Sequence, residues 1–176
     1  ALADYQVEAE DEHILEYMKI SHGKAIDYYR GRYDLSEEFN KSFLHYQELI
    51  RGEDVKPFPY TKEICASIIE AGGTNYIVTH RDEKSLLEYL SCHHMLKLFK
   101  ENVTSESGFK RKPDPEAYEY LLNKYCISPE DVLIVGDREF ELAAAQNAGV
   151  KSCLYDTNRN EIVTKPDYRI ESLREL

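Results

Sequence analysis

Two acidic residues, Asp137 and Glu141, stand where an apolar run gives way to an alanine-rich segment. The run Val132–Val135 predicts a short strand buried on both faces, and the following segment predicts a helix closed by Gly149. Asp137 then falls at the carboxyl end of a strand, where open α/β sheets bind ligands, and Glu141 lies in the first turns of the helix. Two carboxylates so placed suit a hard cation with oxygen ligands. The alternative is that they only complement the helix dipole.

A second strand end carries polar side chains of a different kind. The run Asn75–Thr79 predicts a strand, and a helix capped by Asp82 follows it. The Thr79 hydroxyl, next to free helical N–H groups, suits a phosphate oxygen. His80 and Arg81 are candidates for the same anion. The alternatives are that Thr79 only caps the turn and that His80 and Arg81 are solvated.

The loop Gly108–Pro115 contains three basic residues just before a predicted helix with Asp114 as its cap. Lys112, held between Arg111 and Pro113, is the best placed of the three to reach a fixed point. The alternative is a basic surface loop on an acidic protein.

The elements that must position these residues alternate between strand and helix from residue 61 onward, which predicts a parallel α/β sheet. Residues 1–56 show helical periodicity only, and the proline-rich segment Lys56–Tyr60 marks the boundary between a small helical module and residues 57–176. Ser36 and Thr61 are predicted helix caps. The segment Ser21–Lys24 is predicted to be a polar turn.

Composition limits the classes of partner. The 176 residues are 42% hydrophobic and carry a formal net charge of −11, which argues against broad binding to nucleic acid or to an anionic membrane. No apolar run has membrane length and no signal peptide is visible. The four cysteines lack metal-ligand spacing and are predicted to be reduced core residues of a cytoplasmic protein; they are Cys65, Cys92, Cys126 and Cys153.

Three of these stretches, taken in order, closely resemble the second, third and fourth motifs of the haloacid dehalogenase-like hydrolase superfamily. They are Ile77–Thr79, Lys112–Pro115 and Val135–Glu141. The resemblance covers residue 57 to the end and is closest to the phosphoglycolate phosphatase-like branch. It implies a three-layer, Rossmann-like parallel sheet core over residues 57–176. Residues 1–56 resemble the family's small helical cap, incomplete at its N-terminal side.

The resemblance also implies roles for individual residues. Thr79 would hydrogen-bond the transferring phosphoryl group, and Lys112 would neutralise charge on the nucleophile and the phosphoryl oxygens. Asp137 would bind Mg²⁺ directly, and Glu141, where the family usually has an aspartate, would support it directly or through water. His22 and Lys24 in the predicted polar turn are candidates for substrate contact, although a solvated turn is the favoured interpretation.

The family's first motif, an Asp-x-Asp at the end of the first strand, is absent from the 176 residues. In the family its first aspartate is the nucleophile and its second the general acid and base. In the family's strand order this strand lies between the Thr79 strand and the Asp137 strand, so two central strand edges would be left unpaired without it. Because Ala1 also begins in the middle of a helical pattern, we expect an upstream segment of roughly 20–25 residues.

The sequence therefore predicts a Mg²⁺-dependent phosphatase that hydrolyses a small phosphorylated metabolite through an aspartyl-phosphate, with its nucleophile upstream of residue 1. The 176 residues alone are predicted to be inactive. The alternatives are a catalytically inactive binding or regulatory member of the family, a truncated fragment, or a phosphomutase. A dehalogenase is disfavoured because that branch works without a metal. Neither the substrate nor the oligomeric state can be read from the sequence.

Overall fold

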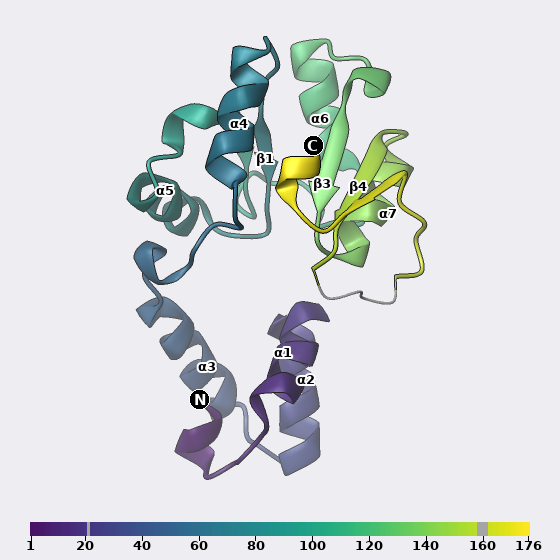
Figure 1. Ribbon diagram of the computed structural model, residues 1–176. Coiled ribbons are helices and arrows are strands. Elements are labelled where there is room, and N and C mark those ends of the chain that lie inside the picture. Colours follow the sequence, from purple (N-terminus) through teal and green to yellow (C-terminus); the bar gives the residue numbers. More distant parts are fainter. Residues whose placement is uncertain (21, 158–161) are drawn as a thin grey trace. The chain divides into compact units, whose positions relative to one another are not determined.

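The computed structural model describes residues 1–20, 22–157 and 162–176. By internal contacts it divides into two compact units, Ala1–Arg51 and Gly52–Leu176 (Figure 1). The sequence places the boundary five residues later, between residues 56 and 57. None of the helices in the described part combines the length and apolar character needed to cross a membrane.

The first unit is helical. A 3₁₀ turn is followed by three helices, whose bounds are Leu2–Tyr5, α1 Asp11–Ile20, α2 His22–Tyr33 and α3 Glu38–Leu49. Among the side chains of this unit whose burial is described, Ala25, Tyr29 and Phe39 are buried, and the Tyr29 hydroxyl lies 2.9 Å from Nδ1 of His13.

Two local predictions in this unit are wrong. His22–Lys24 form the first turn of α2 instead of a polar turn, and Ser21 lies outside the described residues. The burial of Ala25 and Tyr29 along one face of α2 outweighs the turn preference of the polar stretch. Ser36 does not cap α3: Glu37 is the N-cap, and Ser36 contributes only its carbonyl to the turn.

The second unit alternates strands and helices. The helices are α4 Thr61–Glu70, α5 Glu83–Cys92, α6 Glu116–Tyr125 and α7 Glu139–Asn147. The strands are β1 Tyr76–Val78, β2 Glu101–Val103, β3 Leu133–Gly136, β4 Lys151–Tyr155 and β5 Tyr168–Ile170. Short 3₁₀ turns occupy Gly52–Asp54, Leu96–Leu98, Pro129–Asp131 and Leu173–Glu175. Every described strand pair is parallel, so the predicted α/β fold with a parallel arrangement is confirmed.

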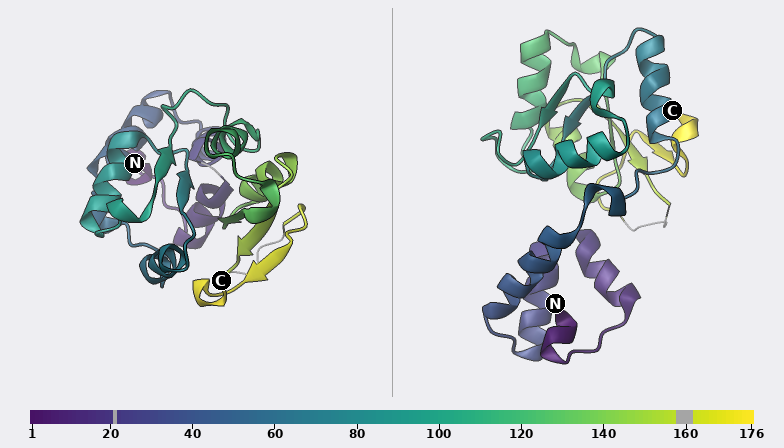
Figure 2. Two further views of the ribbon diagram at one scale, coloured as in Figure 1. Left: turned by 90° about the horizontal axis from the view of Figure 1, so that it is seen from above. Right: turned by 90° about the vertical axis from the view of Figure 1, so that its left-hand side faces the viewer.

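Helices cover both faces of the strands, as Figure 2 shows. On one face, α6 packs against both sheets, and α7 packs beside it on β3. Neighbouring residues of a strand face opposite sides, so Ile77 of β1 contacts α5 on the other face. On that face α4 also packs on β4. The residues in the α6 and α7 contacts include Tyr118, Leu121, Ile134, Ala144 and Ala145. The result is a three-layer core.

The described strands form two sheets, β1-β2 and β3-β4-β5, instead of one. Between β1 and β3 lies a cavity of about 860 Å³, lined by apolar residues of both strands, of α4 and of α6. Leu133 and Val135 of β3 are each 40% exposed because they line this cavity. The prediction that this strand is buried on both faces is therefore wrong.

The predicted helix ends are correct in part. Asp82 caps α5, with its carboxylate accepting a hydrogen bond from the Ser85 N–H, and Gly149 has the left-handed conformation (φ 67°) after α7. Thr61 is not a cap: it is the first residue of α4, and its hydroxyl donates to the Phe58 carbonyl.

Two further local expectations need correction. Pro115, not Asp114, is the N-cap of α6, although the Asp114 carboxylate accepts from the Glu116 N–H. All four cysteines are free, but only Cys153 is a buried core residue. Cys65 is half-buried, and Cys92 and Cys126 are exposed on or beside helix ends, where the apolar stripe does not reach.

Candidate active site

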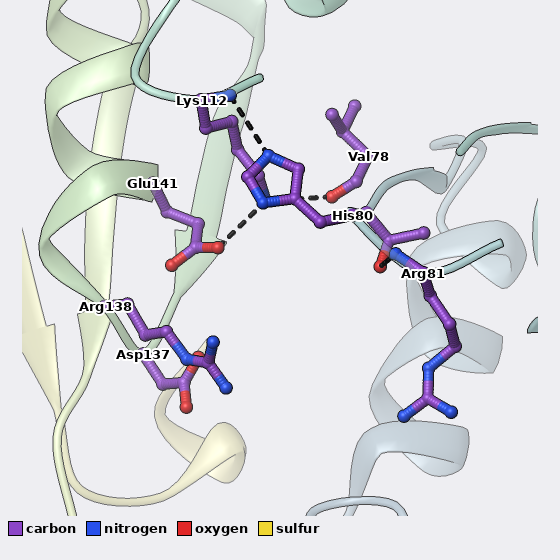
Figure 3. Close-up of polar contacts among 8 residues, drawn as sticks. Val78, His80, Arg81, Lys112, Asp137, Arg138 and Glu141 are labelled. Atoms are coloured by element: carbon purple, nitrogen blue, oxygen red, sulfur yellow. Dashed lines mark hydrogen bonds and ion pairs between the residues drawn. The ribbon is translucent and has the colours of Figure 1, made fainter. Parts of the chain in front are cut away.

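Lys112 lines the cavity and links the end of β1 to helix α7. Its Nζ donates to the Val78 carbonyl at the end of β1 (3.0 Å) and to Oε1 of Glu141 on α7 (2.8 Å), as Figure 3 shows. The two side chains are almost fully buried, with 6% of Lys112 and 13% of Glu141 exposed. A buried ion pair that bridges separate elements fixes the position of its charges. The loop before α6 therefore delivers a lysine to one point, as its sequence predicts.

Glu141 retains acceptor capacity in this arrangement. Its Oε2 is buried and has no hydrogen-bond partner among the described residues. Burial raises the pKa of Glu141 and the nearby Asp137 raises it further, while Lys112 acts in the opposite direction. An unpaired buried carboxylate oxygen is costly unless a donor or a cation satisfies it. Oε2 therefore fits a cation or a metal-bound water.

Asp137 follows β3 directly, and its side chain is 44% exposed. Its Oδ1 lies 4.0 Å from Nε of Arg138, a weak contact that leaves the carboxylate accessible. Among the described residues no group of three or more histidines, cysteines or acids could enclose a metal ion. Two carboxylates nevertheless suit Mg²⁺, which commonly keeps several waters and takes one or two protein carboxylates.

Thr79 lies immediately after β1, and its N–H donates to the Val103 carbonyl at 2.8 Å. Its hydroxyl oxygen accepts the Arg81 N–H at 3.1 Å. In that contact the hydroxyl acts as an acceptor, so its own proton can be donated to an oxygen of a ligand.

His80 contacts the lysine loop instead of standing in solvent. Its Nε2 accepts the backbone N–H of Lys112 at 3.1 Å, and its ring stacks on Phe140 with centroids 5.5 Å apart. Burial lowers the pKa of His80 to about 4, and the positive charges of Lys112, Arg111 and Arg138 act in the same direction. His80 is therefore a neutral ring at neutral pH.

The structure brings together some of the predicted site residues and not others. Lys112 hydrogen-bonds to His80 through its backbone N–H and to Glu141 through Nζ, and Asp137 lies beside Glu141 (Figure 3). The Arg81 guanidinium turns away from this group and lies 5.6 Å from the ring of Tyr89 on α5.

The two candidates in the first unit stand in a separate setting. His22 and Lys24 belong to α2, and Nδ1 of His22 lies 3.2 Å from Nε2 of Gln47 on α3. Their role in substrate contact stays a prediction.

Sequence reasoning missed two residues that shape the site. Phe140 lies under His80, and the cations of Lys112 and Arg138 lie 5.5 Å and 5.7 Å from its ring centroid. Gly136 leaves the space that Glu141 occupies: a Cβ at this position would lie 2.6 Å from Cβ of Glu141. An aromatic residue between two acids, and a glycine just before the first acid, are the signals that could have drawn attention to them.

Gly136→Ala is expected to displace Glu141 and to lower the free energy of unfolding by about 1–3 kcal/mol, because the new methyl group overlaps the Glu141 side chain. Urea unfolding followed by circular dichroism measures the change. The matched control is Gly31→Ala in α2, where nothing lies within 4 Å of the added Cβ. This helical substitution is expected to raise stability by roughly 0.5–1 kcal/mol. Equal stability of Gly136→Ala and the wild type would contradict the close approach.

Known proteins resemble this chain in sequence. A family described as haloacid dehalogenase-like hydrolase matches residues 1–155. A phosphoglycolate phosphatase of Vibrio parahaemolyticus is 32% identical over 123 residues, which cover 68% of this chain and 54% of that protein. The chain thus spans about half the length of the curated relatives it matches.

Solved structures resemble the chain as well. A hydrolase from Streptococcus pneumoniae is 32% identical, with a TM-score of 0.62 over 86% of this chain and 77% of that one. A predicted phosphoglycolate phosphatase from Haemophilus somnus has a TM-score of 0.79 over 97% of this chain and 83% of that one. At 23% identity the second likeness shows the fold alone.

Proposed function

Since the chain belongs to the haloacid dehalogenase-like hydrolase family, we propose that it is part of a Mg²⁺-dependent phosphatase. The substrate is a small phosphomonoester, a phosphorylated metabolite of the cytoplasm. The observation that carries the proposal is the convergence of a buried lysine, a carboxylate with an unpaired oxygen and a second, accessible carboxylate at the carboxyl ends of β1 and β3. Phosphoryl transfer depends chiefly on positioning and on neutralisation of charge, and these groups supply both.

Lys112 and Thr79 serve the phosphoryl group. Nζ of Lys112 has one N–H left after its hydrogen bonds to Val78 and Glu141, and this N–H donates a hydrogen bond to a phosphoryl oxygen. The ammonium charge also stabilises the negative charge that develops on the phosphoryl oxygens. The Thr79 hydroxyl donates to a second oxygen and orients the group for in-line attack. Thr79 and Lys112 are the proposed phosphate-binding residues. The other two predicted candidates face elsewhere, because the Arg81 guanidinium lies against Tyr89 and Nε2 of His80 faces the Lys112 backbone.

Asp137 and Glu141 are the proposed Mg²⁺ ligands. Asp137 offers an accessible carboxylate, and Oε2 of Glu141 offers the buried oxygen that lacks a partner among the described residues. The bound ion would neutralise charge on the phosphoryl oxygens. Lys112 keeps the second Glu141 oxygen occupied, so that the carboxylate presents only Oε2 to the ion.

The nucleophile is proposed to reach the site on a strand that occupies the cavity between β1 and β3. Each of these strands is paired on one edge only in the described part of the chain, and the cavity between them is lined by apolar residues from both covering helical layers. An apolar strand fits such a slot because its alternate side chains enter the two layers. The carboxyl end of a strand parallel to β3 would place an Asp-x-Asp beside Asp137, Glu141 and Lys112. The first of these aspartates would attack phosphorus as the ester P–O bond breaks, and the second would protonate the leaving alcohol oxygen. Water, deprotonated by the second aspartate, would then attack phosphorus of the aspartyl-phosphate, releasing inorganic phosphate and the free aspartate.

The test is hydrolysis of p-nitrophenyl phosphate by the chain produced with the segment that precedes Ala1 in its reading frame. We expect hydrolysis that is abolished by EDTA and restored by Mg²⁺, because two carboxylates alone cannot neutralise a phosphoryl group. Circular dichroism before and after EDTA shows whether the fold persists without the ion. A folded protein that hydrolyses nothing with Mg²⁺ would contradict the phosphatase and favour the inactive binding protein. Transfer of phosphate between sugar hydroxyls without release of inorganic phosphate would favour the phosphomutase.

A further inference from the structure

His80 occupies an unusual position between the lysine loop and α7. The Lys112 N–H points at Nε2 of its ring (Figure 3). Phe140 stacks against the ring at an interplanar angle of 17°. One residue thus contacts the backbone of Lys112 and the helix that carries Glu141. Nothing about an isolated histidine after a strand indicates such a double contact.

The direction of the hydrogen bond fixes the chemical form of the ring. A backbone N–H can only donate, so Nε2 must be the acceptor and carry no proton. The ring is then neutral, with its proton on Nδ1. The charged groups around it, Lys112, Arg111 and Arg138, are all positive, and they disfavour a second proton.

We infer that His80 is a positioning residue, whose neutral ring anchors the Lys112 backbone so that Nζ is held between Val78 and Glu141. The inference rests on the proposed phosphatase function, in which the place of Nζ decides how well the phosphoryl charge is neutralised. Displacement of a catalytic group by about 1 Å can reduce a rate by roughly a hundredfold. A hydrogen bond to the backbone next to the catalytic side chain therefore affects the chemical step more than substrate binding.

Two substitutions separate the contacts of the ring. His80→Phe keeps an aromatic ring for Phe140 but removes the acceptor for the Lys112 N–H. His80→Gln removes the ring but offers an amide oxygen the same number of bonds from Cα as Nε2. In the protein with its upstream segment, we expect kcat of His80→Phe to fall about tenfold or more with KM changed less than about threefold, and His80→Gln to recover most of kcat.

The pH profile adds a readout that a loss of packing would not move. Wild type and His80→Gln should share the same dependence of kcat/KM on pH between roughly 5.5 and 8, because a neutral His80 does not titrate there. If His80 were instead an imidazolium that binds phosphate, its substitution would raise KM. The wild-type profile of kcat/KM against pH would then have a descending limb that the variant lacks. Either of those results, or an unchanged kcat in His80→Phe, would overturn the inference.

Nitrogen NMR of the imidazole tests the contact without any activity. In protein labelled with ¹⁵N at histidine, we expect Nε2 of His80 at the shift of an unprotonated ring nitrogen and Nδ1 at that of a protonated one, at pH 6. A protonated Nε2 would overturn the inference. If the wild type proves inactive, the proposed function fails and His80 has no reaction to serve, while the nitrogen shifts still report whether the Lys112 contact exists.

Discussion

Asp137→Asn is expected to reduce Mg²⁺-dependent hydrolysis on the order of a thousandfold, because an amide keeps the shape of the carboxylate but loses the charge that binds the ion. The side chain is 44% exposed, and the weak contact with Arg138 is the one ion pair that it forms within the described part of the chain. The substitution should therefore leave the fold and the free energy of unfolding almost unchanged. Steady-state kinetics over a range of Mg²⁺ concentrations measure the effect, and the apparent affinity for Mg²⁺ should fall together with the rate.

The matched control is Asp131→Asn. Asp131 is exposed and lies just before the start of β3, whereas Asp137 follows its end. It is also distant in sequence from the residues that contact Lys112. The same chemical change there is expected to leave the rate within about twofold of the wild type. If Asp137→Asn retains the wild-type rate, the placement of the metal site at the end of β3 is wrong.

Lys112→Met is expected to abolish hydrolysis and also to destabilise the fold. The loss of Nζ leaves a nearly buried Glu141 carboxylate and the Val78 carbonyl without their donor. Breaking a buried ion pair by removing one partner costs about 3–5 kcal/mol. Urea unfolding at neutral pH measures the destabilisation, and the phosphatase assay measures a loss on the order of a thousandfold.

A double variant separates these two effects. Lys112→Met with Glu141→Gln removes the uncompensated charge, so stability should recover in large part while activity should not. Lys110→Met is the control, since this lysine of the same loop is 72% exposed and forms only a surface pair with Asp114 at 3.4 Å. Its removal should change neither quantity appreciably. Activity in the double variant comparable to the wild type would exclude Lys112 from the phosphoryl site.

The sequence indicates which strand ends carry the chemistry but not how their side chains meet. Asp137 was predictable at a strand end, because an apolar run followed by an acid and a helix has few other interpretations. The contact between Lys112 and Glu141 joins residues 29 positions apart, and no local pattern reports it. The His80 contact is still harder to foresee, since it involves the backbone of Lys112 and not its side chain. Such contacts depend on how the two sheets lie relative to each other.

Local errors in the predicted fold have a common physical origin. Ser36 and Thr61 are residue types that are common at N-cap positions, and both lie near a helix start. In the structure, however, the N-cap is the neighbouring residue in each case. The exposure of Leu133 and Val135 follows from the cavity beside β3, which composition cannot reveal. Strand and helix identity in the second unit, which depends on longer patterns, agrees with prediction.

The most direct test of the account compares Mg²⁺-dependent release of phosphate from an aryl phosphate by two proteins. One is the 176-residue chain, and the other is the same chain extended upstream by its own reading frame through an apolar strand that ends in Asp-x-Asp. If Lys112, Asp137 and Glu141 form half of a phosphoryl-transfer site that a strand between β1 and β3 completes, only the extended protein hydrolyses the substrate. Equal rates for the two proteins, or no hydrolysis by a folded extended protein, would contradict it.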